Sequence, residues 1–266
     1  MIDRTRLRAR IAGAGIAALL LVFSAAGRAW GAVVEIDASG YQNVQNLAQL
    51  ALAVHNYEST YNVLPGEYLQ SGGSPTLSWR VAILPYLGYS QLYNAFDKTK
   101  AWDDPANLPL LQQMPAVFRS PADAAGVTTT RYEVGTGPGL IFNGASGVKL
   151  SAITDGTSNT LLIGEAASGV PWTAPQDLPI GASPTLAGSG FSSITPGYVP
   201  FAFADGGVQF LSKDIDSPTL LHLFQINDGS VIDPGVKLDY VVVPEPSGLV
   251  LWGLVAFAWV GGRRRV

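Results

Sequence analysis

One long helical segment followed by many short β-like runs is the pattern that most constrains this chain. Across residues 43–61, apolar side chains recur at steps of three or four, which is the spacing of one helix face. Ser39 or Asp37 can cap the start, and Pro65-Gly66 blocks continuation. From Phe118 onward, short runs of β-favouring residues alternate with glycine and aspartate turns. A helix this long must bury its apolar side, so we expect it to pack against the part of the chain that forms the strands.

The helix side that faces the sheet is expected to carry Leu47, Leu50, Ala51 and Val54. His55 lies within the same helix, where a lone histidine is expected to be a structural or surface residue. Further along, the sequence predicts a short apolar element ending near Pro85 and a helix around residues 90–96. We expect Trp79 and Trp102 to be packing residues there.

Three Asp-Gly pairs predict tight turns in the β-rich region, at Asp155-Gly156, Asp205-Gly206 and Asp228-Gly229. The second pair interrupts "FAFADGGVQFLS", which predicts a hairpin with one buried face made of Phe201, Phe203, Val208 and Phe210. A short helix, "SPTLLHLFQIN", is expected before the third pair. The expected strands are TRYEV (130–134), GLIFNG (139–144), VKLSAI (148–153), TLLIGEA (160–166), YVPFAFA (198–204) and GVQFLS (207–212).

The amino-acid composition excludes several kinds of functional site. The chain has no cysteine and only two histidines, His55 and His222, which excludes disulfides, a thiol nucleophile and a cysteine- or histidine-rich metal centre. We expect no cofactor and no metal. Between Ala32 and Val243 there are 8 basic and 18 acidic side chains, a net charge of −10. An acidic domain argues against a nucleic-acid partner, because such binders need basic patches.

The start of the chain has the layout of a secretory signal peptide. Four arginines within the first ten residues precede an apolar run from Ile11 to Gly27. Small residues frame "AWGA", so we expect cleavage between Gly31 and Ala32, with an export translocase and a signal peptidase as partners. An uncleaved N-terminal anchor is the alternative.

The end of the chain has three parts in a fixed order. Pro244, Glu245 and Pro246 come first, an uncharged run from Ser247 to Gly262 follows, and Arg263, Arg264 and Arg265 end it. At 1.5 Å per residue a helix of this run reaches roughly 24 Å, slightly under a bilayer core. The arginines favour the cytoplasmic side, which places the domain outside.

This three-part tail resembles the PEP-CTERM sorting signal of bacterial exported proteins. The resemblance implies recognition by an exosortase-type membrane protease and removal of the tail. An ordinary C-terminal anchor is the alternative. The expected division is therefore a signal peptide (1–31), an exported domain (32–243) and a sorting tail with an apolar helix (244–266).

The middle of the chain resembles a large, mainly planctomycete family of pilin-like proteins of unknown function. The resemblance spans roughly Leu47 to Gly229 and implies a pilin-like α+β domain, in which one long helix packs on an antiparallel β-sheet with long loops. It implies no known activity. The blocks that carry it are "NLAQLALAVHNYESTYNVLPG", "SWRVAILPYL", "QLYNAFD", "FRSPAD", "ITDGTSNTLLIGE", "PWTAPQDL" and "FADGGVQFLS".

The chain departs from that family at three places. The family's F-R-C-P cysteine is Ser120 here, and the histidine of its H-x(9)-D-G motif is Thr195, counted back from Asp205. The arginine-rich start replaces the usual prepilin-like leader. A role for the motif histidine is therefore not carried over.

The stretch "ITDGTSNTLLIGE" places Ser158 after a tight turn, as a hydrolase places its nucleophile. It lacks the second glycine of G-x-S-x-G, and the strand follows the serine instead of preceding it. It also lacks the D-x-[DN]-x-[DN]-G calcium pattern. We expect Asp155 to bond backbone amides in the turn, and leave the role of Glu165 open.

Three readings of function remain. The leading one is a non-enzymatic exported envelope or extracellular-matrix protein with a pilin-like domain, transiently anchored in the membrane by its tail. The second is a carbohydrate-binding module of an exopolysaccharide matrix, which would use exposed Trp102 and Trp172 to stack on sugars. The third is a serine or carboxylate hydrolase, which would need a cleft joining His222 to Ser158 or Glu165.

Overall fold

The structure is a computed structural model that describes residues 33–242. The expected cleavage site at Gly31 and Ala32, the sorting triplet Pro244-Glu245-Pro246 and the basic end Arg263–Arg265 lie outside these residues. The apolar helix expected in the tail lies outside them as well. Within residues 33–242, no helix combines the length and the apolar character needed to cross a membrane.

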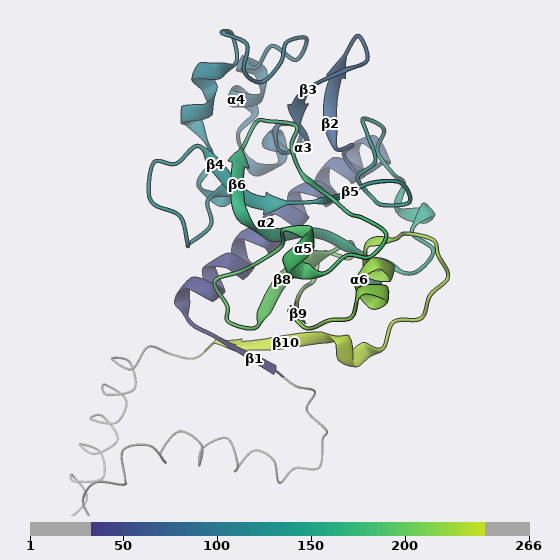
Figure 1. The fold of residues 1–266 in the computed structure, drawn as a ribbon. Helices are drawn as coiled ribbons and strands as arrows, with labels where there is room; N and C mark the ends of the chain where they lie inside the picture. The colour runs from purple at the N-terminus through teal and green to yellow at the C-terminus, as the bar shows by residue number, and fades with distance from the viewer. Residues whose placement is uncertain (1–32, 243–266) are drawn as a thin grey trace, which may run out of the picture. The chain divides into compact units, whose positions relative to one another are not determined.

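A six-stranded sheet with the order β1-β10-β9-β8-β6-β4 is the centre of the fold (Figure 1). All neighbours pair antiparallel except β1 and β10, which pair in parallel at one edge. The expected α+β fold is confirmed, and the sheet is antiparallel apart from the β1–β10 pair at that edge. The strands are β1 (Val33–Ile36), β4 (Thr129–Glu133), β6 (Leu161–Pro171), β8 (Tyr198–Phe203), β9 (Val208–Ser212) and β10 (Lys237–Val242).

Helix α2 (Ala38–Tyr61) covers one face of this sheet and contacts β6, β8 and β9 (Figure 1). Asp37 caps its start by accepting a hydrogen bond from the Gly40 amide at 2.8 Å. The helix ends at Asn62 in a left-handed conformation, before the Pro65-Gly66 stop expected from the sequence. The four apolar residues expected to face the sheet, Leu47, Leu50, Ala51 and Val54, are all fully buried.

The β8–β9 hairpin forms as expected, but its aromatic residues do not share a face. Phe201 lies opposite Gln209, and Ala202 lies opposite Val208. Because opposite residues share a face, Phe201 and Phe203 point away from the side that carries Val208 and Phe210. The expectation of one buried face is therefore wrong, and both faces are covered.

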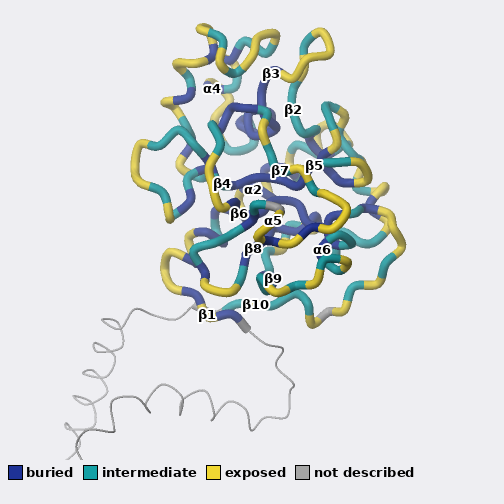
Figure 2. Tube along the Cα trace, in the orientation of Figure 1, coloured by how far each residue is buried: buried dark blue, intermediate teal, exposed yellow. Residues whose placement is uncertain are grey.

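The second face is covered by α6 (Ser217–Phe224), the short helix expected before the third Asp-Gly pair (Figure 1). The rings of Phe201 and Phe224 lie 6.3 Å apart, edge to face. Figure 2 shows the buried segments concentrated in α2, β8 and the strands between the covering helices.

Two of the expected strands are absent from the described chain. The GLIFNG run lies between Gly139 and Gly144, whose φ angles of 78° and 82° bend the backbone, and the VKLSAI run contains a short 3-10 helix, Leu150–Ala152. The remaining elements are β2 (Tyr68–Ser71) paired with β3 (Ser74–Ser78), β5 (Gly135–Thr136) paired with β7 (Leu178–Pro179), α3 (Trp79–Ala82), α4 (Ser90–Ala95), α5 (Leu186–Ser189) and 3-10 turns at Leu84–Leu87, Leu108–Gln113, Ala116–Phe118, Thr157–Asn159 and Pro234–Val236.

The packing role expected for Trp79 is confirmed, since its side chain is fully buried. Trp102 is half-buried and packs against the same core. Trp172 is also fully buried, and its indole N–H donates to the Leu111 carbonyl at 3.0 Å. The expectation that Trp172 is exposed for stacking on a sugar is therefore wrong.

Candidate functional site

The ITDGTSNT loop is hydrogen-bonded to two distant parts of the chain, the Asp228-Gly229 turn and the start of β10. The Asp155 carboxylate accepts hydrogen bonds from the amides of Asp228 and Gly229 at 2.7 and 2.9 Å. Asp155 therefore bonds backbone amides as expected, but those of the distant third Asp-Gly turn rather than its own. On the same loop, the Ser158 carbonyl accepts from Lys237 Nζ at 2.9 Å, which ties the loop to β10.

His222 contacts the same Asp228 turn, and its hydrogen-bond partners do not form a catalytic triad with it. Its Nδ1 lies 2.5 Å from Asp228 Oδ2 and 2.9 Å from Ser230 Oγ. A triad needs the acid and the serine on different ring nitrogens, whereas here both meet Nδ1. Burial alone would raise the pKa of Asp228, but its hydrogen bonds with His222 and Ser230 hold that pKa below the ordinary value.

Glu165 is the centre of a buried polar network between β6 and α2. Its side chain is 1% exposed, Oε2 accepts from Asn43 Nδ2 at 2.6 Å, and Oε1 accepts from the Ser120 hydroxyl at 2.5 Å. The Tyr132 hydroxyl donates to Asn43 Oδ1 at 2.8 Å and accepts from Asn46 Nδ2 at 3.1 Å. Burial raises the Tyr132 pKa, and the Glu165 charge adds to this effect. The network therefore keeps Tyr132 protonated and able to donate.

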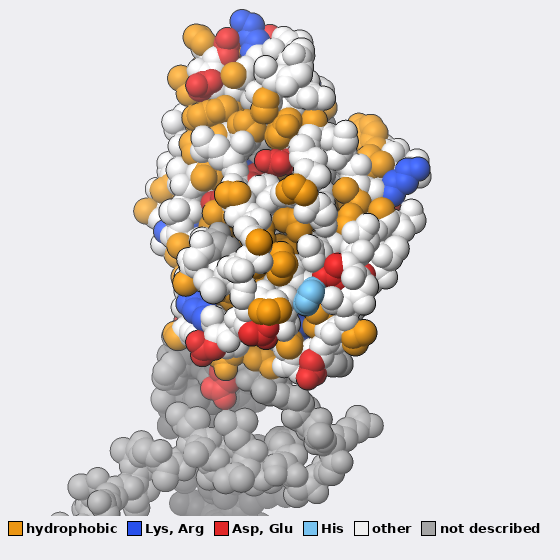
Figure 3. Space-filling view, turned by 45° about the vertical axis from the view of Figure 1, so that its right-hand side comes forward, with side chains coloured by type: hydrophobic (Ala, Val, Ile, Leu, Met, Phe, Trp, Pro, Cys, Tyr) orange, Lys and Arg blue, Asp and Glu red, His pale blue; other side chains and the backbone are white. Residues whose placement is uncertain are grey.

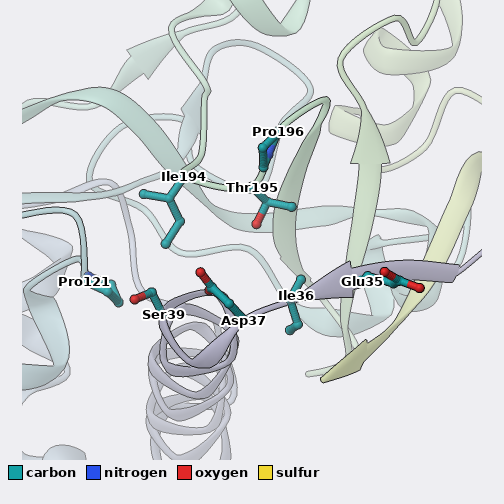
Figure 4. A pocket seen from close by; sticks show the side chains of 8 residues that line it. All are labelled: Glu35, Ile36, Asp37, Ser39, Pro121, Ile194, Thr195 and Pro196. Atoms are coloured by element: carbon teal, nitrogen blue, oxygen red, sulfur yellow. The ribbon is translucent and has the colours of Figure 1, made fainter. Parts of the chain in front are cut away.

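Two hollows lie beside this network. Glu165 lines one of about 160 Å³ together with Arg131, Ser192, Ser193 and neighbouring residues. The second, of about 410 Å³, lies at the N-terminal end of α2 and is lined in part by Asp37, Ser39 and Thr195 (Figure 4). The two share Ile194, so the network and the start of α2 belong to one region of the surface. Ser120, which donates to Glu165, and Thr195, which lines the larger hollow, both lie in this region.

A buried ion pair closes the other edge of the sheet. Arg80 and Asp177 are fully buried, with Nη2 2.6 Å from Oδ1. Arg80 Nε donates to the Tyr132 carbonyl at 3.0 Å, and Asp177 Oδ1 accepts from the Val134 amide at 3.0 Å. These are backbone groups on and next to β4, the last strand of the sheet. The pair therefore satisfies hydrogen-bonding groups that a further strand would otherwise pair.

Glu133 lies beside this ion pair and is nearly fully buried. Burial raises the pKa of its carboxyl to about 8, with Arg80 opposing the shift and Asp177 adding to it. Burial likewise raises the pKa of Asp177 to about 6, although Arg80 and the Val134 amide favour its charged form. Near neutral pH the cluster thus favours one neutral carboxyl and one ion pair.

Glu133→Gln is expected to stabilise the protein at alkaline pH. The pKa of Glu133 is raised from 4.5 to about 8, so the folded state holds the proton more tightly than the unfolded chain. Stability is therefore greatest below pH 4.5 and is lost as the pH rises to about 8. Thermal melts should show a gain over the parent at pH 8.5 that disappears near pH 4.5. The exposed Asp103→Asn variant is the control, and an equal pH-dependent gain there would contradict this origin.

Sequence reasoning singled out Glu165 and Asp155 but not the residues that bind them. It missed Asn43, Arg80 and Asp177 as polar residues of the core. The signal that could have found Arg80 is a charged residue inside the apolar run "SWRVAILPYL". Within residues 33–242, no group of three or more histidine, cysteine, aspartate or glutamate side chains gathers in a way that could hold a metal ion.

The comparisons with known proteins give one family. Residues 42–140 match the family model described as a protein of unknown function (DUF1559). No curated protein matches the chain, and no solved structure does. The matched part includes most of α2 and also Arg80, Ser120 and Tyr132, whereas Glu165 and Asp177 follow it. Residues 42–140 are therefore similar to a family of unknown function, in agreement with the kind of family that the sequence motifs indicate.

Proposed function

We propose that this chain is a non-enzymatic exported protein of the cell envelope or extracellular matrix, with a pilin-like domain that is sorted through its C-terminal tail. One observation carries the proposal. The last strand, β10, ends at Val242, and the Pro244-Glu245-Pro246 triplet begins two residues later. Cleavage near the triplet by an exosortase-type enzyme would therefore leave the sheet and its core whole.

The other end of the domain supports the same proposal. The first strand, β1, begins at Val33, directly after the cleavage site expected between Gly31 and Ala32. Removal of a signal peptide would therefore also leave the sheet whole. β1 and β10 pair with each other at one edge, so both processing sites adjoin the same strand pair.

The surface and the polar clusters fit a protein without catalysis. On the face drawn in Figure 3, lysine and arginine side chains are few and separate, in keeping with an acidic domain without a nucleic-acid partner. Two of the buried charged residues have structural partners: Glu165 binds Asn43 and Ser120, and Arg80 binds Asp177. Trp172 is fully buried, so the carbohydrate-binding alternative lacks one of the two exposed tryptophans that it requires.

Deleting Pro244 to Pro246 tests the sorting proposal. In a host that carries the processing enzyme, the parent is expected to be released, whereas the deletion variant should stay almost entirely in the membrane fraction. The apolar run and Arg263–Arg265 then remain attached to the domain and hold it in the bilayer. The measurements are fractionation with immunoblotting and intact mass, which also reports whether the mature chain begins at Ala32.

The parent chain in a host without the processing enzyme is the control, and it should be retained like the deletion variant. Release of the deletion variant to the same extent as the parent would show that the triplet is only a linker. The sorting assignment would then fail.

A further inference from the structure

A third hollow, of about 390 Å³, lies between α2 and the segment around the 3-10 turn Ala116–Phe118. Three carboxamide side chains of α2 form one part of its lining, and three apolar side chains and one arginine form the rest. The carboxamides are those of Gln42, Asn46 and Gln49, and the other residues are Ala116, Val117, Arg119 and Pro121. Pro121 also lines the larger hollow shown in Figure 4, so the two hollows adjoin.

Asn46 fixes the two sides of this third hollow relative to each other. It is 5% exposed, and its Oδ1 accepts from Gln42 Nε2 at 2.9 Å. Its Nδ2 donates to the Arg119 carbonyl at 3.0 Å and to the Tyr132 hydroxyl at 3.1 Å. A buried carboxamide with both of its polar atoms bonded holds one geometry. A ligand would therefore not have to order this part of the lining when it binds.

Arg119 carries the one charge in the lining. The other two arginines of residues 33–242 are ion-paired, Arg80 with Asp177 and Arg131 with Asp123. The Arg119 guanidinium has no hydrogen-bond or ion-pair partner among these residues, although the domain has a net charge of −10 and many carboxylates. A guanidinium presents five donors in a planar fork that matches a carboxylate. The hollow therefore offers an unused binding group for an anion.

The charge and the lining of the hollow decide which anion fits. A domain of net charge −10 repels a phosphate dianion more than a carboxylate, and the lining holds a single cationic side chain to offset that repulsion. No aromatic side chain lines the hollow, so a sugar ring has nothing to stack on. A carboxylate, in contrast, can bind both prongs of the Arg119 fork.

The carboxamides suit a peptide backbone next to that carboxylate, because side-chain amides donate and accept as peptide groups do. Gln42 Oε1 and the Gln49 carboxamide bind no residue in 33–242. Gln42 and Gln49 lie two helical turns apart, about 10.5 Å, and three residues of extended peptide cover about 10 Å. Val117 and Pro121 can pack against a small apolar side chain. We propose that this hollow binds an extended peptide through a carboxylate that pairs with Arg119.

The test uses the full chain and two matched peptides. Acetyl-alanyl-alanyl-valine ends in a free carboxylate, and its C-terminal amide has the same groups without the charge. Titration calorimetry should show binding of the acid, and the amide should bind at least about tenfold more weakly. Equal binding of the two peptides, or binding of neither, would overturn the proposal. The site does not rest on the sorting proposal, since no lining residue belongs to either processed end.

Arg119→Gln removes the charge and keeps a polar side chain. It should weaken binding of the acid about tenfold, to the affinity of the amide. The melting temperature should stay close to that of the parent, because the guanidinium binds no described residue. The control is Lys149→Gln, which changes the net charge equally at an exposed position outside the hollow. Unchanged affinity in Arg119→Gln, or an equal loss in Lys149→Gln, would contradict pairing of Arg119 with the carboxylate.

Gln49→Ala tests the contact with the peptide backbone. It should weaken the acid and the amide by the same severalfold factor, because the two peptides share their peptide groups. A loss confined to the acid, or no loss for either peptide, would contradict the role given to the carboxamides.

Two further probes distinguish the sources of the carboxylate. Acetyl-alanyl-glutamyl-alanine amide carries it on a side chain. Weaker binding of this probe than of the acid assigns the hollow to a peptide C-terminus, and equal or tighter binding assigns it to an acidic side chain. Trigalacturonate carries its carboxylates on sugar rings. Tighter binding of trigalacturonate than of either peptide would assign the hollow to an acidic polysaccharide and overturn the proposal.

Discussion

Replacing Arg80 with methionine is expected to lower the free energy of unfolding by about 3–5 kcal/mol, because it leaves a buried carboxylate without its partner. Asp177 is fully buried and lies 2.6 Å from the Arg80 guanidinium. The change also removes the donor to the Tyr132 carbonyl at the edge of the sheet. Denaturation with urea, followed by tryptophan fluorescence, measures the loss.

A surface ion pair of this chain is the matched control. Lys100 Nζ and Asp104 Oδ2 are 3.5 Å apart, and the two side chains are 48% and 28% exposed. Lys100→Met should therefore cost at most about 1 kcal/mol. A loss in Arg80→Met no larger than in this control would show that the buried pair contributes little.

The double variant Arg80→Met with Asp177→Leu separates two effects on stability. One is the unpaired buried charge, and the other is the loss of hydrogen bonds to the edge strand β4. Removing both charges relieves the unpaired carboxylate, and such replacements are often neutral or stabilising in other proteins. Here we expect only partial recovery, because the Tyr132 carbonyl and the Val134 amide lose their partners. Full recovery to the stability of the parent would contradict the edge-closing role.

Local patterns in the sequence predicted those elements whose signals are local. The periodicity of residues 43–61 and the cap expected at Ser39 or Asp37 placed α2, and the Asp205-Gly206 pair placed the β8–β9 turn. The prediction of which hairpin residues share a face was wrong, because it depends on the register of the two strands. A pairing of Phe201 with Gln209 moves Phe201 to the side opposite Phe210, and the turn signal does not specify that pairing.

The buried polar clusters around Arg80 and Glu165 were not predicted, and the reason is a different one. Their partners are far apart in the chain: Arg80 and Asp177 are 97 residues apart, and Asn43 and Glu165 are 122 apart. Nothing near either partner in sequence indicates the other. Asp155 shows the same limit. Its turn predicted bonds to backbone amides of that turn, whereas the amides it binds lie 73 and 74 residues further on.

Leu50→Ala is expected to lower the free energy of unfolding by about 2–5 kcal/mol, because it opens a cavity where α2 packs on the sheet. Leu50 is fully buried in the main core, together with Val54 of the same helix, Ile163 of β6 and Ala202 of β8. These strands are held by the backbone ladder, so they can move only partly into the space that the leucine leaves. Urea denaturation and thermal melting both measure the effect.

Leu52→Ala is the matched control for Leu50→Ala, since it makes the same chemical change two residues along the same helix. Leu52 is 61% exposed, so its truncation removes little buried surface and should cost less than about 1 kcal/mol. Gln49→Ala, also on the exposed side, should change stability by at most about 0.5 kcal/mol in either direction. The two leucines thus differ in burial and not in chemistry. Similar losses for both would mean that α2 does not pack on the sheet through its Leu47, Leu50 and Val54 side.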